Sequence, residues 1–108
     1  MDIENSGSVV TSTVNTNDTG NATFDVVPAV AGKRIRLHKF LVSLASADTI
    51  TVKFGSTTIL GPIYCGANGG FVYDCFPQRF RSAEGEALTI TKGSAGTDVT
   101  AQAFYTQD

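Results

Sequence analysis

Hydrophobic and polar residues alternate at every second position in several short stretches of the chain. In TITVKF, residues 49–54, Ile50, Val52 and Phe54 share one parity, and the threonines and the lysine share the other. Successive side chains of a β-strand point to opposite faces, so this alternation predicts a half-buried strand. The same period returns in the closing stretch DVTAQAFYT, residues 98–106.

The longest alternating stretch, IRLHKFLVSL at residues 35–44, slips by one position in its middle. The first two apolar residues share one parity and the last three share the other. A β-bulge inserts one extra residue into a strand, so a bulge at His38 and Lys39 would turn all five toward one face. The predicted inward residues are Ile35, Leu37, Phe40, Val42 and Leu44.

Turn-forming residues recur every 8 to 14 positions between these stretches, and no stretch has a helical period. In residues 22–28 the alternation places Ala22, Phe24, Val26 and Pro28 on one face, and the proline marks a strand end or a sheet edge. Gly61 and Pro62 predict a further break. The pattern favours an all-β protein, an antiparallel β-sandwich of about eight strands, and the uneven strand spacing favours a jelly-roll-like connection.

Residues 1–21 differ in composition from the rest and consist largely of Ser, Thr, Asn, Gly and Val. We expect a polar N-terminal arm there and one β-sandwich domain over residues 22–108. Polar strand-forming segments can add to a neighbouring sheet through main-chain hydrogen bonds. The arm residues predicted to contact a partner are Val9, Val10 and Val14.

Composition excludes some partners. The chain has 108 residues, enough for one core, and a net charge of -2 with only 17% charged residues. A nucleic-acid partner requires clustered Lys and Arg, so none is expected. No apolar stretch is long enough to span a bilayer and no signal peptide is visible, so we expect synthesis in a cytoplasm and no membrane partner.

The two cysteines, Cys65 and Cys75, flank a glycine-rich segment. If residues 66–70 close a hairpin, the sulfur atoms lie roughly 13 Å out of register, too far apart for a disulfide. If the segment crosses between the sheets, a disulfide can form. Free packed thiols, a disulfide and a metal site that also uses His38 all remain open, although the short pair typical of structural zinc sites is missing.

Catalytic constellations are absent from the sequence. His38 is the single imidazole, Glu84 and Glu86 flank a turn glycine, and Asp74 is an isolated acid. No nucleophile elbow, phosphate-binding loop or zinc-protease motif occurs. We therefore expect no enzyme activity and no cofactor, and a cupin-like metalloenzyme would need more His ligands than the chain has.

Four short motifs resemble those of small all-β virion proteins of tailed bacteriophages. They lie within residues 26–106, and they are a strand entry at 31–36, Gly61-Pro62, the Asn68–Gly70 turn and a strand start at 85–88. The two cysteines and the polar first twenty residues depart from that pattern. The resemblance implies a capsid decoration (cement) protein, a homotrimer on the virion surface whose partner is the major capsid protein or another virion protein. On this reading the arm residues Val9, Val10 and Val14 contact the capsid or an adjacent protomer.

A second reading is a receptor- or glycan-binding module of a head or tail fibre. It requires an exposed aromatic residue beside polar hydrogen-bonding groups. The candidate set is Tyr64 or Tyr73 together with Asn68. Asn68, Gly66, Gly69 and Gly70 are also expected to need a positive φ or a close backbone approach.

Overall fold

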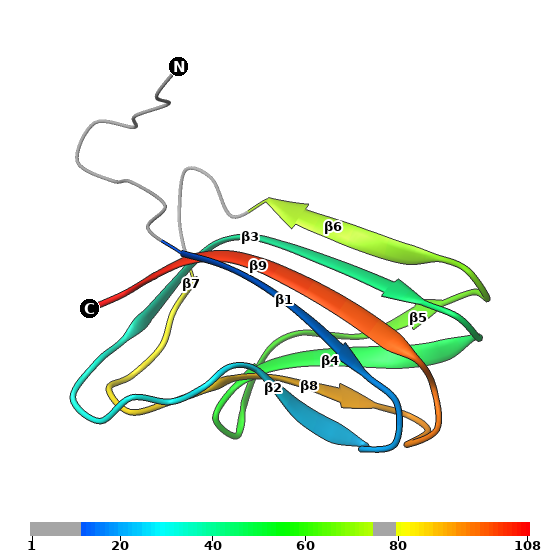
Figure 1. Cartoon of the computed structure of the whole chain (residues 1–108), viewed down its shortest axis with the longest axis horizontal. Coiled ribbons are helices and arrows are strands. Elements are labelled where there is room, and N and C mark those ends of the chain that lie inside the picture. Colours follow the sequence, from blue (N-terminus) through cyan, green and yellow to red (C-terminus); the bar gives the residue numbers. More distant parts are fainter. Residues whose placement is uncertain (1–11, 75–79) are drawn as a thin grey trace.

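Two antiparallel β-sheets pack face to face in this protein (Figure 1). The structure is a computed structural model that describes residues 12–74 and 80–108, and these residues form nine strands and no helix. The strands are β1 (Ser12–Asp18), β2 (Thr23–Val27), β3 (Ile35–Leu44), β4 (Asp48–Phe54), β5 (Thr57–Cys65), β6 (Gly70–Asp74), β7 (Phe80–Arg81), β8 (Leu88–Lys92) and β9 (Val99–Gln107). The predicted all-β sandwich is confirmed.

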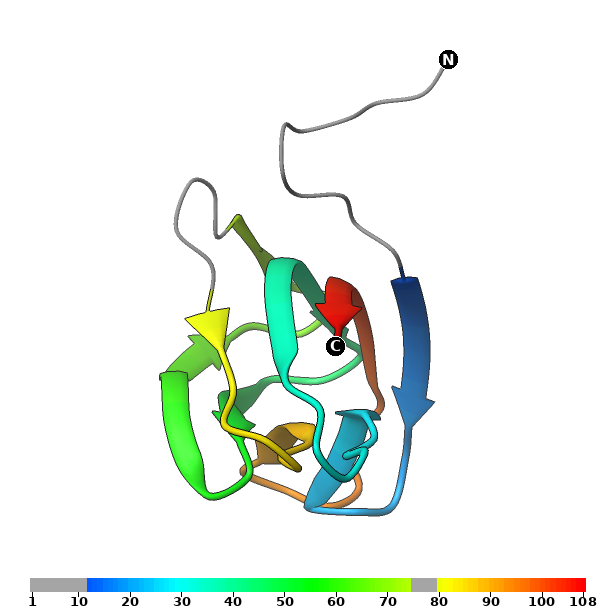
Figure 2. The same cartoon turned by 90° about the vertical axis from the view of Figure 1, so that its left-hand side faces the viewer.

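The strand order is that of a jelly roll. One sheet has the order β1-β9-β3-β6 with β7 also on β3, and the other has the order β2-β8-β4-β5. Because β6 and β7 pair with successive parts of β3, they occupy one strand position. The pairs β1–β9, β2–β8, β3–β6/β7 and β4–β5 then fold the chain into one long hairpin, and the pairs β9–β3 and β8–β4 roll that hairpin into two sheets. Figure 2 shows red β9 between blue β1 and the cyan-green β3.

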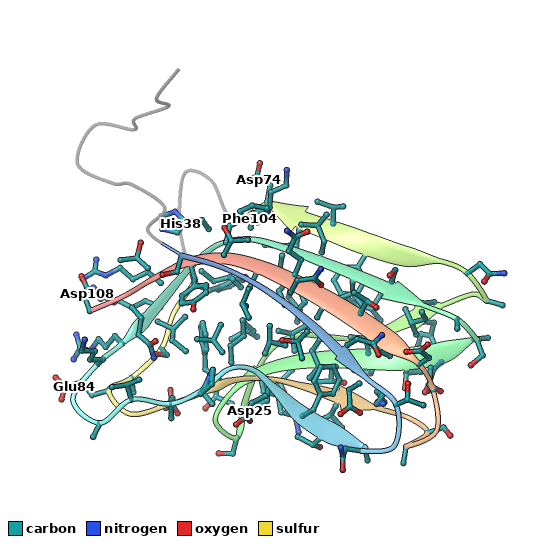
Figure 3. The ribbon with its side chains drawn as sticks, viewed as in Figure 1. Asp25, His38, Asp74, Glu84, Phe104 and Asp108 are labelled. Carbon is teal, nitrogen blue, oxygen red and sulfur yellow. The ribbon has the colours of Figure 1, made fainter. Side chains whose placement is uncertain are left out.

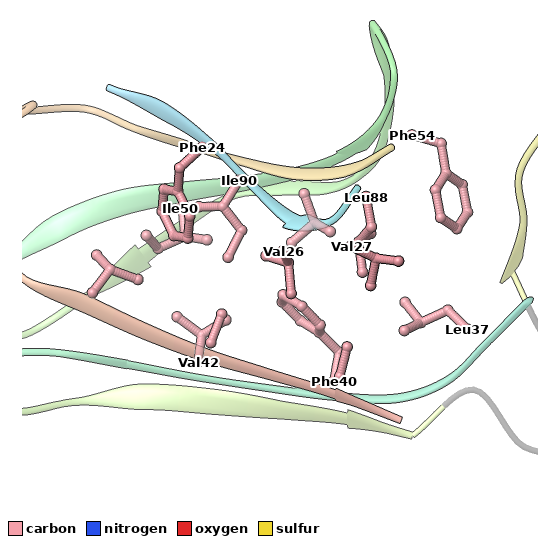
Figure 4. Packing of buried hydrophobic residues seen from close by; sticks show 14 of the residues in the cluster. Phe24, Val26, Val27, Leu37, Phe40, Val42, Ile50, Phe54, Leu88 and Ile90 are labelled. Carbon is pink, nitrogen blue, oxygen red and sulfur yellow. The ribbon is translucent and has the colours of Figure 1, made fainter. Parts of the chain in front are cut away.

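The core fills the space between the two sheets (Figure 4). Phe40 and Val42 of β3 face Val26, Leu88 and their neighbours on the other sheet. Burying one such side chain stabilises the fold by about 1.5–3 kcal/mol. The largest fully buried side chains are Phe40, Ile35, Leu37, Ile50, Leu88, Ile90, Val26, Val27, Val52 and Val99.

The predicted bulge in β3 is confirmed. The register between β3 and β9 shifts between Leu37 and Lys39, so that His38 is the extra residue. On both sides of the shift the apolar residues are buried, and these are Ile35, Leu37, Phe40, Val42 and Leu44. The buried set explains the change of parity, since without the extra residue half of the strand would turn its apolar side chains to solvent.

Two details of the strands differ from the sequence prediction. In β2 a register shift between Asp25 and Val27 buries Val26 and Val27 together, whereas Ala22 and Pro28 are exposed. The strand β5 continues through Gly61 and Pro62, where a break was expected. Because β5 lies at a sheet edge and shifts register twice against β4, it accommodates a proline that a central strand would not.

The segment expected to be an arm contains β1. Over seven consecutive pairs, Ser12–Asp18 lies antiparallel to β9, and Val14 packs against the core. Residues 12–18 therefore belong to the sandwich. Val9 and Val10 lie outside the described residues, and the predicted partner contacts of Val9, Val10 and Val14 stay predictions.

The described part of the chain contains no helix long and apolar enough to cross a membrane.

Candidate functional site

A groove runs across the outer face of the five-stranded sheet. Its volume is about 520 Å³. The floor and walls come from β1, β3, β6, β9 and the connection between β5 and β6. The lining residues that carry the argument below are Asn15, Leu41, Asn68, Val72, Thr100 and Gln102.

Register places four of these side chains in one row. Asn15 of β1 pairs with Gln102 of β9, Gln102 pairs with Leu41 of β3, and Leu41 pairs with Val72 of β6. Cross-strand partners project from the same face with their Cβ atoms about 4.5–5.5 Å apart. The row thus changes from two amides to two apolar side chains across the sheet, and Val72 is 59% exposed.

The chain crosses from one sheet to the other between β5 and β6, and this crossing brings Asn68 to the groove. Leu44 of β3 donates its N–H to the carbonyl of Gly69, which fixes the crossing against the end of β3. A Cβ at Gly70 would overlap the carbonyl oxygen of Val42, so a larger residue could not approach β3 as closely. Asn68 itself has φ 56°, a left-handed conformation that asparagine tolerates.

The sequence predicted a positive φ or a close backbone approach at Gly66, Gly69 and Gly70, and the structure bears this out for only some of them. Gly70 is the clear close approach, and a Cβ at Gly69 would lie 2.9 Å from the carbonyl oxygen of Gly66. Gly66 has open space around it and no positive φ, so neither reason applies to it.

The groove lining combines apolar side chains with amides and hydroxyls, and none of its described side chains is charged. Among the described residues, the amides of Asn15, Asn68 and Gln102 make no side-chain hydrogen bond. Asn17, on the same face, is different because it donates to Asp98 and to Thr100 at 2.8 Å each. The groove amides are therefore donors and acceptors that the described part of the fold does not use.

A second hollow of about 310 Å³ adjoins the groove at the end of the sheet. It shares Ser43, Asn68 and Thr100 with the groove and adds Ala45 and Asp98. The shared residues place the two hollows side by side.

Edge strand β1 presents a second kind of surface. Edge strands leave N–H and C=O groups unpaired, and proteins usually blunt them with Pro, Lys, bulges or short length. In the described residues β2 and β5 contain register shifts, a proline lies within β5 and another directly follows β2, and β6 has five residues. By contrast, β1 has seven residues in continuous register and no Pro, Lys or Arg. Within residues 12–74 and 80–108 no strand pairs with its outer edge, which is therefore open to strand addition.

A buried lysine holds the neighbouring end of the sandwich together. The Lys92 side chain is 0% exposed, and its Nζ donates to Asp18 Oδ1 at 2.9 Å and to the carbonyl oxygens of Thr97 and Ala95 at 2.8 and 3.2 Å. The same nitrogen lies 5.4 Å from the ring centre of Phe24. A hydrogen bond from Asn21 and the contact with Lys92 outweigh burial and lower the pKa of Asp18.

Asp48 anchors the loop between β8 and β9. Its carboxylate accepts the Thr97 hydroxyl at 2.7 Å, the Ser94 N–H at 2.9 Å and the Thr49 N–H at 2.7 Å. Burial alone would raise the pKa of Asp48, but these hydrogen bonds hold it below its ordinary value. With its acceptor capacity used inside the loop, this acid is structural.

The cysteine region follows the crossing alternative, and the hairpin alternative is wrong. In the described residues β5 pairs with β4, and β6 pairs with β3 in the other sheet. Cys65 packs against the core and its thiol contacts the carbonyl of Ile63 at 3.9 Å. Burial, together with the nearby charge of Asp48, raises the pKa of the Cys65 thiol. Cys65 is a free cysteine in the structure, and Cys75 lies outside the described residues.

The other sequence-predicted residues are not brought into one site. His38 Nε2 lies 3.1 Å from the Thr106 hydroxyl on the outer face of the five-stranded sheet, whereas Cys65 belongs to the other sheet (Figure 3). Glu84 lies 3.9 Å from Arg34 at the surface, and Glu86 accepts the N–H of Ala83. In the described residues no group of His, Cys, Asp or Glu side chains could hold a metal ion.

The predicted aromatic set does not meet at the groove. Tyr64 is 83% exposed, and its partner Thr49 places it on the outer face of the four-stranded sheet. Tyr73 pairs with inward-facing Phe40 and stacks on Phe80 with ring centres 5.5 Å apart. Of the predicted set, only Asn68 lines the groove. Sequence reasoning did not identify Asn15 and Gln102 as site residues. The one feature that could have indicated them is that each is a polar residue between two residues that face the core.

A search of protein-family models finds no match to this chain, and a search of curated proteins finds none either.

Proposed function

We propose that this chain is a structural protein of the virus particle, a capsid decoration protein of a tailed bacteriophage that binds the outer shell as a trimer. The partner is the major capsid protein or another virion protein. The proposal rests on the resemblance in residues 26–106 and on one structural observation, the open edge of β1. Its action is docking, and no described cluster of side chains is assigned a catalytic role.

Three of the four resembling motifs fall where the chain changes direction, whereas Gly61-Pro62 lies within β5. The turn before β3 contains Gly32 with φ 76°, and the turn before β8 contains Gly85 with φ 74°. The Asn68–Gly70 motif forms the crossing between the sheets. These positions support a shared jelly-roll framework, because they are where strand order is set.

The open edge supplies a route to the shell. A partner strand placed beside β1 would extend the five-stranded sheet through main-chain hydrogen bonds, which do not require a particular side-chain chemistry. Many copies on a symmetric shell then add weak contacts through avidity. Because the residues of β1 are largely polar, its open edge is compatible with a protein that stays in solution before assembly.

Copy counting tests the location. We expect mass spectrometry of purified particles to find hundreds of copies per particle, as shell decoration requires. A handful of copies would place the protein in a tail or fibre and overturn the decoration proposal, and no copies would overturn any virion role. Sedimentation analysis of the isolated protein checks the trimer.

A substitution at the edge tests the docking mode. Thr13 is exposed on β1, so Thr13→Lys should leave folding intact while placing a charge beside any incoming strand. We expect binding to empty shells to weaken about tenfold, which corresponds to about 1.4 kcal/mol. Thr58→Lys, at an exposed position of edge strand β5, is the matched control. Equal binding of the two variants would contradict docking through β1.

A further inference from the structure

We propose that the groove on the outer face of the five-stranded sheet binds a neutral oligosaccharide. The chemistry of the lining carries this inference. Among the described residues that line it, the polar side chains are amides and hydroxyls and none is charged. An amide offers donors and acceptors together, as a sugar hydroxyl does, whereas an anionic or cationic ligand would need an opposite charge in the lining.

The arrangement of polar and apolar groups fits a sugar ring. Leu41 and Val72 are cross-strand neighbours and form an apolar strip on the groove floor. Asn15 and Gln102 lie on the β1 side of that strip, and Asn68 lines the groove from the β5–β6 connection. A pyranose ring has an apolar C–H face bordered by hydroxyl groups, so it can cover the strip while its edges reach the amides.

The amides are available to a ligand. Those of Asn15, Asn68 and Gln102 make no side-chain hydrogen bond within the described residues, whereas Asn17 on the same face is held by Asp98 and Thr100. Gln102 is half-buried and lies between Asn15 and Leu41 on a central strand of the sheet. Paired strands on both sides therefore hold the backbone that carries its amide. Such placement supports selective binding better than a mobile surface amide does.

Size favours an oligosaccharide over a single sugar. The groove of about 520 Å³ lies within the usual range for ligand sites, and a hollow of about 310 Å³ adjoins it at Ser43 and Thr100. The lining of this hollow includes Asp98, whose carboxylate already accepts hydrogen bonds from Asn17 and Thr19. The site uses side chains on the face of the sheet, whereas the docking proposed above uses the main chain at the edge of β1. The two surfaces can therefore act independently.

The test measures binding of defined sugars by isothermal titration calorimetry and saturation-transfer NMR. The probes are neutral oligosaccharides of two to four units built from glucose, galactose, mannose or N-acetylglucosamine. We expect at least one probe to bind, and Gln102→Ala and Asn15→Ala each to weaken it about tenfold through a lost hydrogen bond. Thr51→Ala, on the outer face of the other sheet, is the control and should bind normally.

Three outcomes would overturn the proposal. They are no binding of any probe to the unchanged protein, binding that both groove variants leave intact, and groove-dependent binding of a neutral peptide in place of every sugar. Because Gln102 and Asn15 lie on different strands, one variant still reports if the other fails to fold. Gln102→Ala should bind empty shells normally, so failure here is distinguishable from failure of β1 docking.

Discussion

The ammonium group of Lys92 lies 2.9 Å from a carboxylate oxygen of Asp18, although the two residues are 74 positions apart in the chain. Lys92 ends β8 and Asp18 ends β1, so the contact joins the two sheets at one end of the sandwich. Three carbonyl oxygens, those of Asp18, Ala95 and Thr97, also lie within 3.3 Å of the ammonium nitrogen and share its three N–H groups with the carboxylate. A buried charge of this kind is tolerated because it is paired and hydrogen-bonded.

Removing this charge should destabilise the fold. In Lys92→Met, the Asp18 carboxylate and the nearby carbonyl oxygens lose their donor, and we expect the free energy of unfolding to fall by about 3–5 kcal/mol. Lys53→Met is the control, since Lys53 lies half-buried on the outer face of the same sheet, and its loss should cost less than about 0.5 kcal/mol. Urea unfolding measures both. Similar losses in the two variants would show that the contact with Asp18 adds little.

Stability should fall in acid. The folded state lowers the pKa of Asp18 and Asp48 below their ordinary 3.8, so the unfolded chain binds more protons as the pH falls toward that value. The stabilisation is fully present above about pH 5 and is lost as the pH drops below about 4, through the folded pKa values. Thermal unfolding from pH 7 to pH 2 measures this change.

Asp48→Asn is the control for the acid effect. The variant should be less stable at pH 7, because an amide cannot accept all three hydrogen bonds from Thr49, Ser94 and Thr97 as a carboxylate does. Its stability should also change less between pH 5 and pH 2, since one titrating group is gone. A curve as steep as that of the unchanged protein would contradict the role given to Asp48.

Gly70 and Gly66 should respond differently to alanine. A Cβ at Gly70 would overlap the carbonyl oxygen of Val42, which belongs to a central strand and cannot move aside easily. We expect Gly70→Ala to cost about 2–3 kcal/mol by forcing β6 away from β3. Gly66→Ala meets open space and should change stability by less than about 0.5 kcal/mol. Chemical denaturation measures the free energy of unfolding of both variants. Equal losses would show that β6 is free to shift away from β3.

The Cys65 thiol should react slowly in the native protein. Burial and the charge of Asp48 raise its pKa, so the thiolate fraction at pH 8 is below that of an ordinary cysteine. In Cys75→Ser, where Cys65 is the single thiol, we expect alkylation by iodoacetamide to be slow and to accelerate in urea. Mass spectrometry follows the reaction, and equal rates in the two conditions would contradict a packed thiol.

The unchanged protein provides a further measurement on the cysteines. Intact mass without reducing agent, before and after alkylation in urea, distinguishes two free thiols from a bridge between Cys65 and Cys75. The crossing between the sheets removes the register argument that excluded the bridge, so the chain connection itself permits either state.

Local alternation was enough to predict the faces of the strands. The parity change in β3 led to the bulge at His38, and the alternation in residues 49–54 led to the buried residues of β4. These predictions succeed because the period of a strand is a property of a few successive residues and does not depend on its neighbours. The prediction failed at Gly61 and Pro62, because an edge strand tolerates a proline and the sequence does not mark which strands are edges.

Alternation along single strands did not predict the groove or the burial of Lys92. Asn15 and Gln102 are ordinary polar positions in their own strands, and they become one surface because β1 pairs with β9 in a particular register. Lys92 likewise looks like the solvated end of a strand until the roll of the sheets brings Asp18 beside it.

By itself, the sequence determined that the chain is all-β, which side chains of β3, β4 and β9 face inward, and where β3 must bulge. The tertiary structure decided that β1 is an edge strand of the sandwich, that residues 65–70 cross between the sheets, and which polar residues share the outer face. The physical reason is the distance along the chain over which each property is determined. Alternation is a property of adjacent residues, whereas strand pairing and register depend on the summed packing of strands that are far apart in the chain.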